Sequence, residues 1–509
     1  MLWNKLFRTK SIDSIIKEVE QHPDLIESHG HSESLKRDLG VRDLAALGLA
    51  AIVGAGIFST VGKACSDGGP AVSLLFIGIA IACGFSALCY AEFASRIPIA
   101  GSAYTYSYAV FGEWIAWIIG WDLLLEYAVG NITVAIAWSG NLNNFLQGFG
   151  IHLPPYLITS FLEAKNNMPE LWASAPRILG IPFIINIPAF IINLLITLLV
   201  YIGIKESKKF ANGMVLFKIV VILIVIIIGA FYVIPSNWSP FVPNGMSGVL
   251  KGVSAVFFSY IGFDAISTTA EECKNPQRDL PKGMIYSLII STALYVLVAL
   301  VLTGMVHYSN LNTEAFMATA FQRIGLNWIG GLIAFSALIA TASVMLVFQI
   351  GQPRIWMSMS RDGLLPKKFS EVHPRFKTPA FATVVTGLFV GIPSLFLDAE
   401  LVTDMCSIGT LFAFILVCGG VIVLQQRDNK KASDLQTTTP KFKTPYINGK
   451  YLVPILVILF FALFFNNSNS IETIFPFDKG FVEWKHQIPF WGFILIAVYA
   501  AIKSFIHQW

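Results

Sequence analysis

Apolar windows about 20 residues long recur along the chain, and each is long enough to cross the hydrocarbon core of a bilayer. Hydrophobic residues make up 55% of the 509 residues and charged residues only 13%, about half the charged fraction of a typical soluble domain. We therefore expect an all-α integral membrane protein embedded in a lipid bilayer, and the net charge of +4 gives no reason to expect nucleic-acid binding. The twelve predicted spans are residues 43–65, 71–96, 112–147, 183–203, 212–234, 248–271, 283–306, 327–353, 380–397, 402–424, 452–466 and 488–506.

Basic residues are distributed unevenly between the two sides of these spans. With both termini on one side, most of the 35 Lys and Arg residues fall in the tails and loops of that side. Because cytoplasmic loops are enriched in Lys and Arg, we expect a cell-membrane protein with both termini in the cytoplasm. The tail, residues 1–42, has an apolar stripe from Ile12 to Val19 that predicts a short amphipathic helix. Residues 425–451 are expected to form a cytoplasmic loop.

Lys218 stands inside an apolar run, residues 214–233. On the predicted spans, every other Lys or Arg falls in a loop, a tail or a helix end. A cation near the bilayer centre costs about 2.5–3.5 kcal/mol on insertion scales, so a partner or a function must offset it. A lysine that snorkels to the interface, or that pairs permanently with backbone carbonyls, is the structural alternative. We favour a functional role because charged residues at this depth are rarely idle.

Two spans carry glycines that predict an interrupted helix. The first span has Gly-Ala-Gly at residues 54–56, and the sixth has Ser259 and Gly262 near its centre. Glycine costs about 1 kcal/mol in a helix interior, and unwound backbone is tolerated in a membrane only where it lines a cavity or is buried in protein. Close helix packing is the alternative use of such glycines. Corresponding interruptions in two halves of a chain instead point to the central site of a transporter.

The two interruptions offer complementary backbone chemistry. The half-helix after the first has free N–H groups and a positive dipole end, which suit a carboxylate. Unwound carbonyls in the second accept hydrogen bonds from an ammonium group. Together they predict a site for an α-amino acid. The candidate substrate-binding residues are Val53, Gly54, Ala55, Gly56, Ile57, Phe258, Ser259, Ile261, Gly262, Phe263 and Phe348.

Acidic residues also lie within the predicted spans. Asp122 and Glu126 are four residues apart and should project from one helix face, and Asp264 follows the second interruption. Intramembrane carboxyl groups commonly relay protons, whereas a hydrogen bond to a neighbouring helix is the stronger alternative for Asp122. Further charged residues near cytoplasmic helix ends are expected to form gate or loop ion pairs: Glu92, Glu271, Glu272, Arg354 and Arg361.

Several long motifs resemble those of the amino acid–polyamine–organocation transporters, and within them the cationic amino acid transporter branch with its bacterial members. The resemblance covers residues 35–425, and its motifs are GAGIF (54–58), YAEFASRIPIAGSAYTYSY (90–108), GWDLLLEY (120–127), FFSYIGFDAIS (257–267), EECKNPQRDLP (271–281) and SRDGLLP (360–366). It implies two inverted repeats of five helices, residues 43–234 and 248–424, with helices one and six unwound and a peripheral pair in residues 452–509.

The resemblance also implies roles for the intramembrane charges. Sodium-coupled relatives of this fold hold an ion between helices one, five and eight, and Lys218 falls near that site. Its ammonium would replace sodium and make transport sodium-independent. The positions matching Glu126 and Asp264 are candidates for proton coupling in the bacterial relatives.

The residues nearest the interruptions are apolar, so we expect small or medium neutral L-amino acids as substrates. Ala55 departs from the hydroxyl residue that many relatives have there. The prediction is a secondary active, proton-coupled symporter working by alternating access. An exchanger, a Lys/Arg permease and an amino acid sensor are the alternatives, and an accessory small membrane subunit is left open. No HExxH, GxSxG or Walker A motif occurs, so we expect neither an enzyme nor a cofactor or metal.

Overall fold

The computed structural model describes residues 8–10, 37–54, 56–97, 99–178, 180–311, 316–431 and 442–445, together with the isolated positions 455, 458, 495 and 499. The predicted tail helix lies outside the described residues, as do, apart from the four isolated positions, the last two spans. The predicted cytoplasmic loop, residues 425–451, begins too early, because residues 425–431 continue the preceding helix. Of the rest of that loop, only residues 442–445 are described.

Each of the first ten predicted spans coincides with helical structure. In chain order the elements are α3 (Val41–Ile52), η1 (Gly56–Thr60), α4 (Val61–Gly68), η2 (Gly69–Ala71), α5 (Val72–Arg96), α6 (Ala103–Phe111), α7 (Glu113–Gln147), η3 (Pro155–Leu157), α8 (Phe161–Asn167), α9 (Pro169–Ser174), β1 (Arg177–Ile178), β2 (Ile181–Pro182), α10 (Ile187–Ile202), α11 (Ile204–Ala230), η4 (Pro235–Trp238), α12 (Gly245–Lys251), α13 (Val253–Phe258), η5 (Phe263–Glu272), α14 (Pro276–Met305), η6 (Tyr308–Asn310), α15 (Phe316–Arg323), α16 (Asn327–Arg361), η7 (Lys367–Ser370), α17 (Ala380–Ser394) and α18 (Ala399–Lys431).

Seven helical stretches of the described chain are long and apolar enough to cross a membrane, and α10 and α17 are shorter apolar helices. The prediction of an all-α, multi-pass membrane protein is confirmed at this level. Strand structure in the described residues is limited to the antiparallel pair β1–β2 and an isolated bridge between Leu39 and Cys273.

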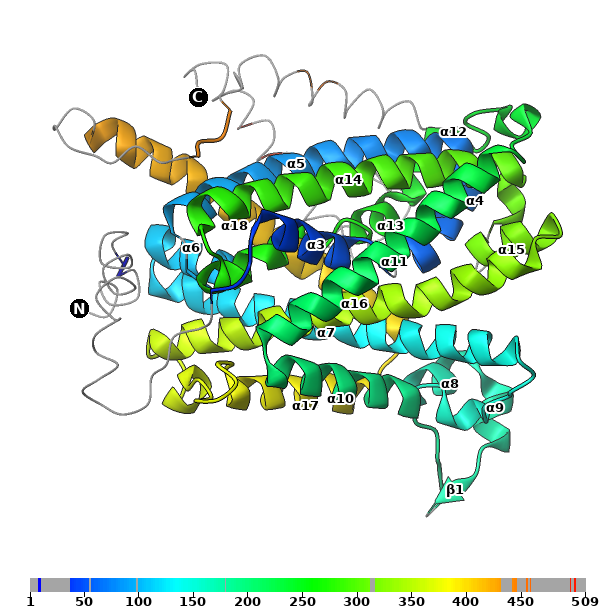
Figure 1. Ribbon diagram of the computed structural model, residues 1–509, viewed down its shortest axis with the longest axis horizontal. Coiled ribbons are helices and arrows are strands. Elements are labelled where there is room, and N and C mark those ends of the chain that lie inside the picture. Colours follow the sequence, from blue (N-terminus) through cyan, green and yellow to red (C-terminus); the bar gives the residue numbers. More distant parts are fainter. Residues whose placement is uncertain are drawn as a thin grey trace, which may run out of the picture.

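The long helices pack in layers around α7 and α16 (Figure 1). These two 35-residue helices lie against each other; α5 packs on α14, and α10 packs on α17. Burial covers 72% of the apolar window of α16 but only 33% of that in the stretch containing α5. A helix that is apolar all round and buried all round is central, whereas an apolar face left open in a membrane protein faces lipid. The α7–α16 pair is therefore the core on which the other helices are mounted.

The first predicted interruption is present. Helix α3 ends at Ile52, and Val53 has the non-helical backbone angles φ −80° and ψ 84°. Helical structure resumes at Gly56 as the π-helical turn η1, which leads into α4. The end of α3 is thus left with carbonyl groups that no following helical turn satisfies.

The second interruption is also present. Helix α13 ends at Phe258, and the chain resumes at Phe263 as the 3₁₀ helix η5. Gly262 has φ +111°, a backbone conformation that disfavours residues with a side chain. This glycine is therefore required by the break itself.

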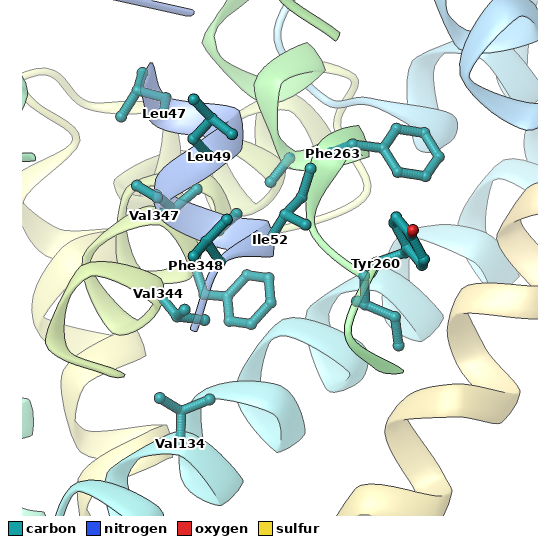
Figure 2. Close-up of a cluster of buried hydrophobic side chains, with 14 of the residues drawn as sticks. Leu47, Leu49, Ile52, Val134, Tyr260, Phe263, Val344, Val347 and Phe348 are labelled. Carbon is teal, nitrogen blue, oxygen red and sulfur yellow. The ribbon is translucent and has the colours of Figure 1, made fainter. Parts of the chain in front are cut away.

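The two interruptions touch each other. A Cβ atom added at Gly56 would lie 2.6 Å from the Cα atom of Ser259, and one added at Gly262 would lie 2.7 Å from the Cβ atom of Ala51. The glycines thus serve both predicted purposes, an unwound backbone and close packing. Figure 2 shows apolar side chains of α3, α16 and the second interruption gathered around this contact between the two interruptions.

Candidate functional site

The side chain of Lys218, on α11, is fully buried and points to the first interruption. Its ammonium donates hydrogen bonds to the carbonyl oxygens of Ala50 (3.1 Å) and Val53 (2.5 Å) and to the hydroxyl of Ser343 (2.8 Å). Snorkelling to the interface is therefore excluded by the geometry. The other structural alternative, pairing with backbone carbonyls, matches the contacts.

Three separate elements meet at this ammonium. The lysine comes from α11, the two carbonyls from the end of α3 and the hydroxyl from α16. The carboxyl end of a helix carries a partial negative charge, so a cation there is electrostatically favourable. All three acceptors are neutral, which leaves the positive charge of Lys218 uncancelled by a carboxylate contact. The arrangement has the form of a cation site whose cation is covalently attached to the protein.

Tyr295 of α14 joins the two interruptions. Its hydroxyl lies 2.7 Å from the carbonyl oxygen of Ile52 and 3.1 Å from that of Ser259, and the side chain is fully buried. Both carbonyls only accept hydrogen bonds, so the single phenolic proton is shared between them. Tyr295 was not among the site residues predicted from the sequence. The signal was a tyrosine in the middle of an apolar membrane helix, where its hydroxyl needs a partner.

The apolar candidate residues lie in two places, one group between the two interruptions and Phe263 apart from it. Val53, Ile57 and Ile261 are buried at the interruptions, and the ring of Phe348 packs on Tyr127 with centroids 5.4 Å apart. Figure 2 shows Phe348 and Val344 beside Ile52 at the end of α3.

Phe263 lies apart from the Phe348 group. Its ring packs against Tyr90 of α5 and Phe414 of α18, with centroid distances of 6.1 and 5.2 Å. Phe258 is partly buried and packs on the main core, and Ala55 lies outside the described residues. The structure therefore places Phe263 behind the second interruption, on the side of α5 and α18.

Two carboxyl groups are buried next to the second interruption. The side chain of Asp264 accepts a hydrogen bond from Tyr127 (3.2 Å), and that of Glu126 accepts one from Thr410 of α18 (2.6 Å). In each carboxyl group the second oxygen has no hydrogen-bond partner within the described part of the chain. Because Tyr127 follows Glu126 directly, α7 links the two groups.

Asp122 shares a helix face with Glu126, as predicted. A Cβ atom added at Gly409 of α18 would lie 3.2 Å from the Oδ1 atom of Asp122 and 3.5 Å from the Cβ atom of Glu126. Both residues thus face α18, although Asp122 is only partly buried.

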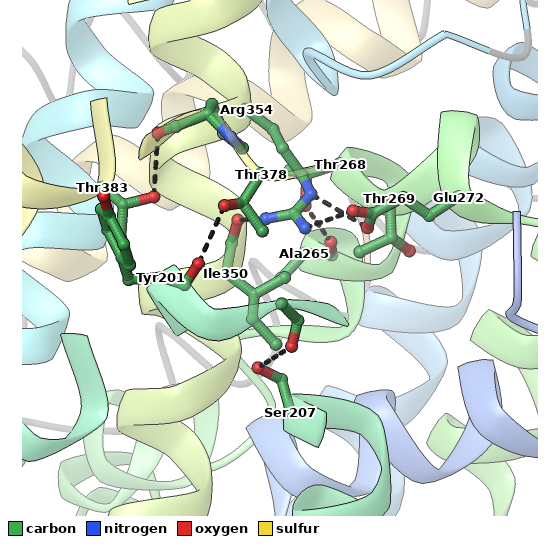
Figure 3. A network of polar contacts seen from close by, with 12 residues as sticks. Tyr201, Ser207, Ala265, Thr268, Thr269, Glu272, Ile350, Arg354, Thr378 and Thr383 are labelled. Atoms are coloured by element: carbon green, nitrogen blue, oxygen red, sulfur yellow. Dashed lines mark hydrogen bonds and ion pairs between the residues drawn. The ribbon is translucent and has the colours of Figure 1, made fainter. Parts of the chain in front are cut away.

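All five charged residues named for the helix ends form ion pairs, Glu92 with Arg96 four residues further along α5 and the other four with one another. Glu272 of η5 makes a buried two-pronged pair with Arg354 of α16, at 2.5 and 3.0 Å, and Arg354 also donates to the carbonyl of Ile350 (Figure 3). Glu271 pairs with Arg361 at 2.8 Å. These pairs tie the segment after the second interruption to the central helix α16. Among the described residues no group of His, Cys, Asp and Glu could hold a metal ion.

Comparisons with known proteins all match this chain to membrane transporters. The model of the amino acid permease family matches residues 39–502. The branched-chain amino acid permease BcaP of Bacillus subtilis is 42% identical over 456 residues, which cover 89% of this chain and 91% of that protein. A methylthioribose transporter of the same organism is 40% identical over 454 residues, covering 89% and 90%. The vacuolar cationic amino acid transporter 4 of Arabidopsis thaliana is 36% identical over 429 residues, covering 83% and 67%.

Proposed function

Since the chain belongs to the amino acid permease family, we propose that it is a secondary active amino acid transporter that works by alternating access. Its relatives are transporters rather than enzymes. The observation that carries the proposal is the contact between the two interruptions, where unwound backbone of two helices meets in the core of the α7–α16 bundle. The inverted-repeat arrangement of residues 43–234 and 248–424, the peripheral pair and twelve spans in all belong to this proposal.

The two interruptions would hold the backbone of the amino acid. Its carboxylate would bind the free N–H groups after the first interruption, at residues 54–57, and its ammonium the carbonyls of residues 258–262. Val53, Ile57, Ile261 and Phe348 would line the side-chain space, and Phe263 would support the second interruption from behind.

We propose that the ammonium of Lys218 takes the place of a transported sodium ion. The ammonium is bound by three neutral oxygen acceptors, from the end of α3 and from α16. A sodium ion would require ligands of the same kind. A covalently attached cation would keep the end of α3 neutralised at all times. Transport would then need no sodium.

Glu126 and Asp264 are proposed to carry the transported proton. Each has one unpartnered carboxyl oxygen in a buried setting, and a buried carboxyl group is far easier to accommodate when protonated. Asp122, on the same face of α7 and less buried, is proposed as an auxiliary group.

Neutral L-amino acids fit the apolar lining best, and the name of the Bacillus subtilis branched-chain permease agrees with that chemistry. A Lys/Arg permease is the second candidate, favoured by one observation: the two unpartnered carboxyl oxygens could bind a cationic side chain. The relatives named as cationic amino acid transporters fit this candidate. Exchange without net proton movement would use the same pocket.

A cell-membrane location with both termini in the cytoplasm completes the proposal, on the strength of the Lys and Arg distribution. An accessory subunit is not required by it.

Uptake of labelled L-valine and L-arginine into proteoliposomes, with and without an inward proton gradient, tests the proposal. We expect valine to accumulate against its gradient only when the proton gradient is present. Accumulation of arginine alone would favour the second candidate, and transport of neither amino acid would contradict the proposed function.

A further inference from the structure

Ser102, in the loop between α5 and α6, has a backbone conformation that side-chain-bearing residues rarely adopt. Its angles are φ +53° and ψ −138°, and in the described chain only Lys377 shares a positive φ without being glycine. Ser102 is also fully buried. Glycine would adopt this conformation without strain, so the serine is retained at a cost. Strain of this kind persists only where the surrounding structure enforces it, and it is concentrated at functional sites.

The hydroxyl of Ser102 makes a specific contact with the second interrupted helix. It lies 2.7 Å from the hydroxyl of Ser267 in η5, and the Ser267 hydroxyl lies 2.6 Å from the carbonyl oxygen of Asp264. A carbonyl can only accept, so Ser267 donates its one proton to Asp264 and Ser102 donates to Ser267. The result is a directed chain from the loop to the backbone of Asp264.

We propose that Ser102 is a positioning residue for Asp264, an inference that rests on the proposed proton-coupled function. The chain Ser102–Ser267–Asp264 fixes the first turn of η5, and that turn sets the direction of the Asp264 carboxyl group. Loss of the Ser102 hydroxyl would remove one of the two hydrogen bonds of the Ser267 hydroxyl and leave the turn less fixed. Proton coupling would weaken, while substrate binding between the interruptions would persist.

The loop itself is anchored independently. The carbonyl oxygen of Ala100 accepts a hydrogen bond from Ser358 of α16 at 2.7 Å, and its N–H donates to Glu271 at 3.3 Å. Removing the Ser102 hydroxyl therefore need not release the loop. Ser358 provides a matched control, because its buried hydroxyl holds the same loop without contacting the chain to Asp264.

The titratable neighbours of Asp264 come from three helices, α5, α7 and α18, and they are unchanged in all the variants below. They are Cys83 and Tyr90 of α5, Glu126 and Tyr127 of α7, and Cys406 of α18.

The test compares Ser102→Gly, Ser267→Ala, the double variant and Ser358→Ala with the wild type in proteoliposomes. Ser102→Gly relieves backbone strain but removes one buried hydrogen bond, so we expect its melting temperature to stay close to that of the wild type. The measured quantity is the ratio of proton-driven uptake to substrate exchange, together with its pH profile. We expect Ser102→Gly and Ser267→Ala each to lower this ratio about fivefold, the loss expected for one buried hydrogen bond. The double variant should be no worse than Ser267→Ala, because Ser102 acts through the hydroxyl that Ser267→Ala already removes.

Ser358→Ala should leave the ratio and the pH profile unchanged. An unchanged ratio in Ser102→Gly, or an equal loss of uptake and exchange, would overturn the inference while leaving the transport function in place. A wild type that exchanges amino acids but shows no proton-driven uptake would instead overturn the coupling proposal, and this inference with it.

Discussion

The two helix interruptions are built from the same backbone device but treat charge in opposite ways. At the first, the ammonium of Lys218 has three hydrogen-bond acceptors, as many as it has donors. At the second, Asp264 and Glu126 each keep one carboxyl oxygen without a partner in the described residues. A buried ammonium with a full set of acceptors is better stabilised as a cation than one without them, whereas a carboxyl group with an unpartnered oxygen is costly to keep ionised. On the proposed function, the first interruption carries a permanent charge and the second an exchangeable one.

Removing the permanent charge should have the largest effect. Lys218→Met deletes a cation and leaves two carbonyls and a hydroxyl without their donor. Hydrogen bonds from charged groups contribute about 1.5–3 kcal/mol each, so we expect uptake to fall roughly 100-fold or more. Initial rates of valine uptake at equal protein content measure this. Lys209→Met is the control, since Lys209 is an exposed lysine of the same helix; normal transport by Lys218→Met would break the comparison.

Separating the two interruptions should have the next largest effect. In Gly56→Ala the new methyl group would meet the backbone of Ser259 at 2.6 Å, so one chain must shift. Overpacking of this kind costs about 2 kcal/mol, or roughly 30-fold in substrate affinity measured by equilibrium binding. Gly78→Ala, where nothing lies within 4 Å, should bind as the wild type does. Equal affinity in Gly56→Ala would show that the contact is not part of the site.

Neutralising Asp264 or Glu126 should uncouple substrate uptake from the proton gradient without abolishing transport. We expect Asp264→Asn and Glu126→Gln each to lower proton-driven uptake about tenfold, which corresponds to about 1.4 kcal/mol, with substrate exchange retained. The pH dependence of uptake should flatten in both variants. Asp122→Asn, at the less buried neighbour, should change uptake less than twofold. Equal losses of exchange and uptake would assign these carboxyl groups to folding or substrate binding instead.

Deleting the hydroxyl that joins the two regions should give the smallest effect. Tyr295→Phe leaves the carbonyls of Ile52 and Ser259 without their shared donor, at a cost of about 1 kcal/mol, or roughly fivefold in the KM for valine. Tyr260→Phe removes a comparable hydroxyl, bonded to the carbonyl of Phe76 at 3.1 Å, and should leave the KM unchanged. A fall in the maximal rate alone would indicate fewer active molecules rather than a changed site.

Much of this comparison was readable from the sequence, because its signals are local. The length of the apolar runs predicted ten helical regions, and the glycines predicted the two interruptions. Lys218 was recognisable as a charged residue within an apolar run. The sequence did not reveal which groups meet across the fold. Tyr295, the Ser102–Ser267 chain and the direction of Phe263 depend on contacts between residues far apart in sequence. Ser102 in particular has an ordinary side chain, and only its backbone angles mark it.

The central claim is that the Lys218 ammonium replaces a transported ion, and sodium dependence tests it most directly. The initial rate of proton-driven valine uptake by the wild-type protein should be measured with sodium replaced stepwise by choline at constant ionic strength. If the ammonium replaces sodium, the rate stays constant down to nominally sodium-free buffer. A rate that rises with sodium and saturates would contradict it.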